Sequence, residues 1–148
     1  MFLLRHLLRP ILISIISGIL FCGCSTDNID ARKQEKWLQY SALSYEVRNL
    51  IEQRTICQGM NSDAVYIAFG EPDEEFNDQE LKGTFRWVYG EALSAKKPKM
   101  FFKEYKKGDR VYLQRCNKKE KNQNIYSRAE IIFSRDRVFQ WQLLDKQR

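Results

Sequence analysis

The sequence predicts an α+β fold, with two helices packed on one face of a three- to four-stranded antiparallel sheet. In the first half of the chain, apolar residues recur at steps of three and four, which is typical of a helix with one buried face. In the second half they alternate with polar residues, which is typical of strands. Because the helical patterns come first and the strand patterns follow, we expect the helices to form a layer of their own.

The first expected helix covers residues 31–53. No glycine or proline interrupts it, and its apolar stripe consists of Trp37, Tyr40, Leu43, Val47, Leu50 and Ile51. A turn around Gly59 ends the pattern, since glycine readily takes a positive φ. Asn61 or the residue after it can cap a second, short helix, which Gly70 ends and Pro72 keeps from continuing.

Four later segments carry the strand pattern. They are residues 84–90, 110–116, 128–134 and 138–144. Only residues 135–137 separate the last two, so we expect those two to form a hairpin.

Residues 1–23 have the pattern of a secretion signal that ends at a lipid-attachment cysteine. Arg5 and Arg9 precede an uncharged, largely apolar run from residue 11 to residue 21, and Gly23 stands directly before Cys24. The segment resembles a bacterial lipobox. That resemblance implies a mature chain that begins at Cys24 and carries three acyl chains, enough for firm anchoring.

Two alternatives for this segment stay open. A retained anchor helix is one, although a spanning helix needs about 20 apolar residues and this run is shorter. Modification of Cys22 is the other, although the bulky Phe21 precedes it. Ser25, rather than an aspartate, follows Cys24, and in enteric bacteria this pattern is associated with the outer membrane. We therefore expect residues 24–30 to be a tether and residues 31–148 to form one domain that faces the periplasm.

Composition limits the chemistry of that domain. Loss of residues 1–23 removes two of the 25 Lys and Arg residues and none of the 19 Asp and Glu residues, which leaves a net charge of +4. The only histidine, His6, leaves as well. Histidine-dependent nucleophilic catalysis and histidine-ligated zinc are thereby excluded from the mature chain. We expect no enzyme activity, no cofactor, no metal and no small-molecule substrate.

Two cysteines, Cys57 and Cys116, remain in the mature chain. In an oxidising compartment they could form one disulfide, or they could stay two buried thiols. Sequence alone leaves both options open, because the geometry of the two Cα atoms decides.

Charge is concentrated in two segments. Residues 71–80 hold six acidic residues, but they lack the spacing of a calcium-binding loop, so we expect a solvated connection. Residues 91–126 form a long basic insert. Its aromatic and basic side chains could contact anionic lipid or an acidic partner protein, or the insert could be a solvated loop. An exported location disfavours nucleic acid. The candidate contact residues are Lys96, Lys97, Lys99, Phe101, Phe102, Lys103, Tyr105, Lys106 and Lys107.

Residues 51–72 contain an apolar residue, then Gly-Met, a short helix with a valine, and then Gly-x-Pro. The positions are Ile56, Gly59, Met60, Val65, Gly70 and Pro72, followed by Trp87 in the first expected strand. This pattern resembles the signature of the SmpA/OmlA family, small outer-membrane lipoproteins similar to the BamE subunit of the β-barrel assembly machine. Most of these positions suit a structural role in turns and core. The resemblance implies a BamE-like fold of two helices on a three-stranded sheet.

The resemblance also implies a function. We expect a non-catalytic accessory protein of the outer membrane that binds envelope proteins, among them the β-barrel assembly machine, in outer-membrane protein assembly or envelope integrity. A second hypothesis is a lipid-tethered protein inhibitor that binds an enzyme cleft through an aromatic sheet face, since the β-lactamase inhibitory proteins resemble this fold. An envelope enzyme is the third, but no nucleophile–base pair is recognisable.

Overall fold

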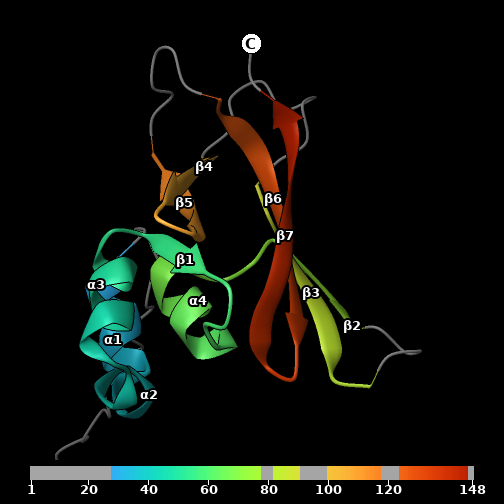
Figure 1. Cartoon of the computed structure of the whole chain (residues 1–148). Coiled ribbons are helices and arrows are strands. Elements are labelled where there is room, and N and C mark those ends of the chain that lie inside the picture. The colour runs from blue at the N-terminus through green and yellow to red at the C-terminus, as the bar shows by residue number, and fades with distance from the viewer. Residues whose placement is uncertain (1–27, 78–81, 91–99, 118–123, 147–148) are drawn as a thin grey trace, which may run out of the picture.

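The expected fold class is wrong. The computed structural model describes residues 28–77, 82–90, 100–117 and 124–146, and within them the chain is dominated by strands. Seven strands form one antiparallel sheet that curls into a half-barrel, and the four helices are short. Figure 1 shows the helices gathered on one side of the molecule and the long β6–β7 hairpin on the other.

The first expected helix is three helices: α1 (Ile29–Glu35), α2 (Trp37–Ala42) and α3 (Tyr45–Glu52). Lys36 departs from helical geometry between α1 and α2, with φ −105° and ψ 35°. Leu43 is extended after α2, and the Ser44 hydroxyl accepts a hydrogen bond from the Val47 N–H at 3.3 Å. That side chain caps a new helix start, which competes with continuing the old one.

The second expected helix is confirmed as α4 (Ser62–Phe69). The Asn61 side chain caps it by accepting from the Ala64 N–H at 3.0 Å. Gly70 ends it with φ +91°, a conformation that side chains with a Cβ rarely adopt. Five of the eight α4 residues are buried, so this short helix is surrounded by core.

The strands are β1 (Thr55–Cys57), β2 (Glu74–Asn77), β3 (Thr84–Tyr89), β4 (Phe101–Lys107), β5 (Arg110–Cys116), β6 (Tyr126–Ser134) and β7 (Arg137–Lys146). Their order in the sheet is β1-β5-β4-β6-β3-β2, and β7 pairs with the opposite edge of β6. The expected strands at 84–90, 110–116, 128–134 and 138–144 are thus present. The expected hairpin is also confirmed, with Arg135 and Asp136 at positive φ in its two-residue turn.

The basic insert is part of the sheet. Its residues 101–107 and 110–116 are the paired strands β4 and β5, which lie between β1 and β6. Gly108, at φ +63°, begins the two-residue turn that joins them. Phe102 is fully buried, so the interpretation of these residues as a solvated loop is wrong.

The core lies where α4 fills the curl of the sheet. The Phe69 ring is 5.6 Å from the ring of Tyr89 on β3, edge to face, and 5.9 Å from the ring of Phe102 on β4. All three rings have essentially no exposed surface, and full burial of an aromatic side chain stabilises a fold by roughly 1.5–3 kcal/mol. These contacts hold the two halves of the sheet around one helix.

Backbone hydrogen bonds bring the curled sheet close to a ring. The segment that follows β1 meets the start of β7, where Gly59 N–H donates to the Val138 carbonyl at 2.9 Å and Val138 N–H donates to the Met60 carbonyl at 2.8 Å. Asn61 and Arg137 form an antiparallel bridge next to them. Past this junction β1 and β7 are not paired in the described structure, and the ring stays open on that side.

Candidate functional site

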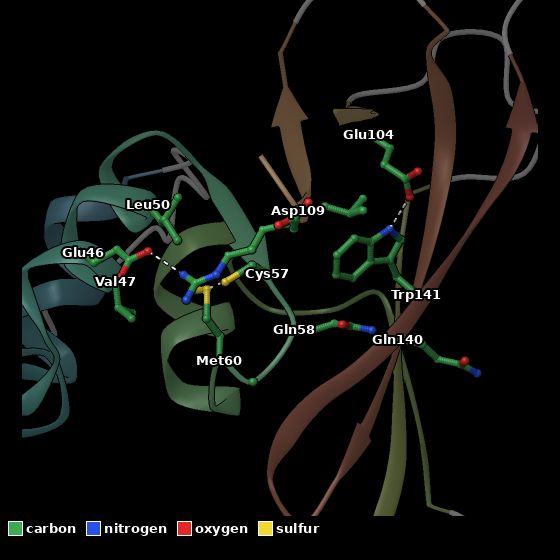
Figure 2. Close-up of a pocket in the computed structure, with 13 residues that line it drawn as sticks. Glu46, Val47, Leu50, Cys57, Gln58, Met60, Glu104, Asp109, Gln140 and Trp141 are labelled. Carbon is green, nitrogen blue, oxygen red and sulfur yellow. Dashed lines mark hydrogen bonds and ion pairs between the residues drawn. The ribbon is translucent and has the colours of Figure 1, made fainter. Parts of the chain in front are cut away.

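A groove of about 620 Å³ opens where the ring is not closed. We call it the β7 groove. Its walls are α3, β1 with the turn after it, the β4–β5 hairpin and β7 (Figure 2). The lining residues are Glu46, Val47 and Leu50 from α3, Cys57, Gln58, Gly59 and Met60 from β1 and its turn, Glu104, Asp109, Arg110 and Val111 from the hairpin, and Gln140 and Trp141 from β7.

An ion pair crosses the groove between α3 and the hairpin. The Arg110 guanidinium lies 2.7 Å from Glu46 Oε1 (Figure 2). Both side chains are more than 60% exposed, at 64% and 63%. Exposed pairs of this kind contribute about 0–1 kcal/mol, so a ligand can displace the contact at small cost.

Trp141 forms the opposite wall. Its indole Nε1–H donates to Glu104 Oε2 at 2.8 Å, which ties β7 to β4 (Figure 2). The side chain is partly exposed, and the residue faces the same side of the sheet as its partner in β6, Ile131. A partly exposed tryptophan in a concave site offers a large apolar contact together with a polar handle.

Cys57 lies in the floor of the groove, and its thiol is not activated. Burial raises its pKa above the usual 9.0, and Glu46 raises it further, while Arg110 acts in the opposite direction. At neutral pH the thiol is therefore protonated, and a protonated thiol is a poor nucleophile and metal ligand. In the parts of the chain that the structure covers, no three His, Cys, Asp or Glu residues come together as a metal site would require.

The backbone of β7 is the most distinctive feature of the groove. One edge of β7 pairs with β6 over its whole length. The other edge bonds to residues 58–62 only near its start, where Gln58 Nε2 also donates to the Phe139 carbonyl at 2.9 Å. Beyond Phe139, no strand in the described ranges pairs with this edge. Since main-chain groups alternate between the two edges of an antiparallel strand, every second residue of β7 beyond Phe139 directs its N–H and C=O away from β6.

The SmpA/OmlA-like positions lie mostly in the scaffold. Gly59 takes φ +85° in the turn after β1, Gly70 ends α4, and Pro72 follows two residues later. Met60 and Val65 are buried at 4% and 0% exposure. Trp87, on β3, packs its ring 4.8 Å from the ring of Phe133. Of these residues, only Gly59 and Met60 also line the β7 groove.

The candidate contact residues of the insert differ in their exposure to solvent. Phe102 is in the core and cannot contact a partner, and Tyr105 stacks on Tyr112 at 5.3 Å. Lys106 and Lys107 are exposed at the end of β4, whereas Phe101 and Lys103 are partly exposed. Lys96, Lys97, Lys99 and Cys24 lie outside the described residues, as do residues 1–23 of the expected signal.

Cys57 and Cys116 are not joined by a disulfide. Cys57 on β1 stands opposite Tyr112, and Cys116 lies four residues further along the paired strand β5. Four residues of strand span about 13 Å, whereas bridged cysteines have Cα atoms less than about 7 Å apart. The register therefore keeps the two thiols apart.

The groove residues were not predicted from the sequence. The patterns do not single out Glu46 or Arg110, and for a tryptophan on an expected strand, such as Trp141, packing in the core is the default expectation. One local signal was available: Gly108-Asp109 between two strand-compatible runs is a typical two-residue hairpin turn. It would have placed Arg110 and Val111 beside the turn of an ordered hairpin.

Comparisons with family models, with curated proteins and with solved structures found no match to this chain. Membership of the SmpA/OmlA family stays a prediction. The fold that the resemblance implied is not the fold of this chain. Among the helices that the structure describes, none has the length and apolar character needed to cross a bilayer.

Proposed function

We propose that the chain is a non-catalytic accessory protein, anchored by lipids on Cys24 in a bacterial outer membrane, that holds extended segments of other envelope proteins in its β7 groove. The main support for the proposal is the edge of β7 along the groove, with which no strand in the described part of the chain pairs. It supports binding of a backbone more directly than it supports chemistry on a small molecule.

Addition of a strand to β7 fits the physics of the site. An extended segment pairs with a free strand edge through main-chain hydrogen bonds, and side-chain pockets then add selectivity. Here Trp141 and Val111 offer apolar contacts, while Glu46 and Arg110 offer one charge of each sign. The inserted strand would continue the sheet beyond β7 and move the curled sheet toward closure.

The lipid anchor gives this binding a location. The pattern of the first 24 residues supports it. Anchoring confines the domain to the membrane surface, which raises its effective concentration near membrane partners. Outer-membrane protein assembly and envelope integrity are the processes that the SmpA/OmlA resemblance favours.

The inhibitor hypothesis receives no comparable support. It requires an aromatic sheet face that is open to a partner. In the described structure the aromatic side chains of β3 pack inward, with Phe85 stacked on Phe133 at 4.6 Å and Trp87 in contact with both.

Photo-cross-linking in intact cells of the native host tests the proposal. A photoreactive residue in place of Val111, inside the groove, is compared with one in place of Glu75, which is exposed on β2 and does not line the groove. We expect envelope proteins to be cross-linked from position 111 and not from position 75. Equal cross-linking from both positions, or only background at position 111, would count against it.

A further inference from the structure

A second surface lies on the helices nearest the proposed anchor. Trp37 and Leu38, consecutive residues at the start of α2, are 61% and 78% exposed. Figure 1 shows α1 and α2 at the end of the helical side, away from the β6–β7 hairpin. Large apolar side chains side by side at such exposure indicate a contact surface, whereas a single one would need no explanation.

The short segment between Cys24 and α1 limits the distance between this surface and a bilayer that holds the lipids of Cys24. Asn28, the N-cap of α1, is four residues after Cys24, and four Cα–Cα steps span at most about 15 Å. Trp37 lies nine residues beyond Asn28, which adds about 14 Å at the helical rise of 1.5 Å per residue. An anchor at Cys24 therefore keeps α2 within reach of the bilayer surface.

The charged residues near Trp37 and Leu38 determine whether electrostatic or apolar attraction would hold these residues at a bilayer. Lys33 lies 2.8 Å from Asp30 and 2.6 Å from Glu52, and Lys36 lies 3.1 Å from Asp63. These cations are already paired with carboxylates of the protein, so they have little charge left for anionic headgroups. Apolar and aromatic contact is the remaining attraction, and tryptophan is favoured at the boundary between headgroups and acyl chains.

We propose that Trp37 and Leu38 insert into the interfacial region of the bilayer that carries the lipids of Cys24. The proposal rests on the lipid anchor of the proposed function. The anchor and α2 together fix the domain at two points, so the protein holds one orientation at the leaflet and does not swing on its tether. The contact does not depend on anionic lipid, because its cations are neutralised within the protein.

Fluorescence quenching by brominated lipids tests this contact. The full lipoprotein, purified from its native host, is reconstituted into phosphatidylcholine vesicles with brominated or ordinary acyl chains. We expect quenching in the brominated vesicles, loss of most of it in Trp37→Phe, and a decrease in Leu38→Asp. Gln39→Asp, which adds the same charge at an exposed neighbouring position, should keep it. Adding phosphatidylglycerol should leave the quenching unchanged.

The outcomes separate the two proposals. If intact mass shows no lipid on Cys24, the anchor fails, and this inference fails with it. If the lipids are present but Trp37→Phe is quenched as strongly as the parent protein, the contact is wrong and the anchor stands. Circular dichroism of each variant checks that the fold is retained.

Discussion

Gly90 shows how a single residue fixes the path of the sheet. It follows β3 at φ +90°, and its N–H donates to Asp73 Oδ2 at 2.7 Å. A Cβ at this position would stand 2.0 Å from the carbonyl oxygen of Ser127, which belongs to the backbone of β6. Both the dihedral angle and the close approach of two chains therefore require glycine here.

Gly90→Ala should consequently destabilise the protein by about 3 kcal/mol or more, since strain and overpacking add. Gly83→Ala is the matched control. Gly83 has φ +81° but no atom within 4 Å of the added Cβ, so only the strain remains, at about 1–2 kcal/mol. Urea denaturation of both variants measures the difference. Equal losses would show that β6 does not pass this close to Gly90.

Cys57 reports on the electrostatics of the groove. Because burial raises the pKa of its thiol above 9.0, alkylation by iodoacetamide in a Cys116→Ser background should be slow at neutral pH and accelerate only above the usual thiol range. Glu46→Gln should shift the rate profile to lower pH, and Arg110→Gln should shift it to higher pH. A profile that reaches its plateau near neutral pH would contradict the protonated thiol described here.

Among the elements, the junction of α1 and α4 depends on a tyrosine. The Tyr66 hydroxyl on α4 donates to Glu35 Oε2 on α1 at 2.7 Å. Burial, followed by this hydrogen bond, raises the pKa of Tyr66 to about 12 from 10.0. The folded protein thus favours the protonated phenol. Its contribution to stability is complete below pH 10 and is lost as the pH rises toward 12.

In Tyr66→Phe, the free energy of unfolding should therefore decrease less between pH 10 and about 12 than it does in the parent protein. Part of the decrease should remain, because burial also raises the pKa of Tyr89. Tyr45→Phe removes an exposed hydroxyl and is the control, which should follow the parent protein. Urea titrations at several pH values provide the measurement, and parallel curves for Tyr66→Phe and the parent would refute the assignment.

Local signals predicted the elements that local chemistry determines. Asn61 and Gly70 define α4, and the alternation in residues 84–90 and 128–144 defines β3 and the β6–β7 hairpin. The break at Leu43 was missed because the apolar stripe continues through it, while the Ser44 cap starts a new helix. Strand β4 was missed because its many lysines suggested a solvated loop, although Phe102 is buried.

The curl of the sheet was beyond prediction for a different reason. It depends on contacts between distant segments, above all the bonds between residues 59–62 and the start of β7. A pattern of apolar residues shows which side chains are buried, but it does not show which strand edges meet. The β7 groove exists only where those edges separate, so its residues could not be grouped from the sequence.

At the scale of the whole molecule, β2 and β7 can be compared as edges to which an extended segment could add. The edge of β2 is exposed and carries Glu74 and Glu75, and charged side chains on an edge discourage pairing with other chains. The edge of β7 beyond Phe139 instead faces a groove with Trp141 in its wall. We therefore expect an extended segment to select β7 over β2.

Amide hydrogen exchange tests that selection most directly. The full lipoprotein is measured alone and in the presence of an unfolded outer-membrane β-barrel polypeptide. We predict slower exchange in residues 139–146 of β7 and in the groove wall formed by residues 110–111, with exchange in β2 unchanged. Protection of β2 instead, or no protection of β7 under conditions where the polypeptide is bound, would contradict the claim that this groove holds extended segments.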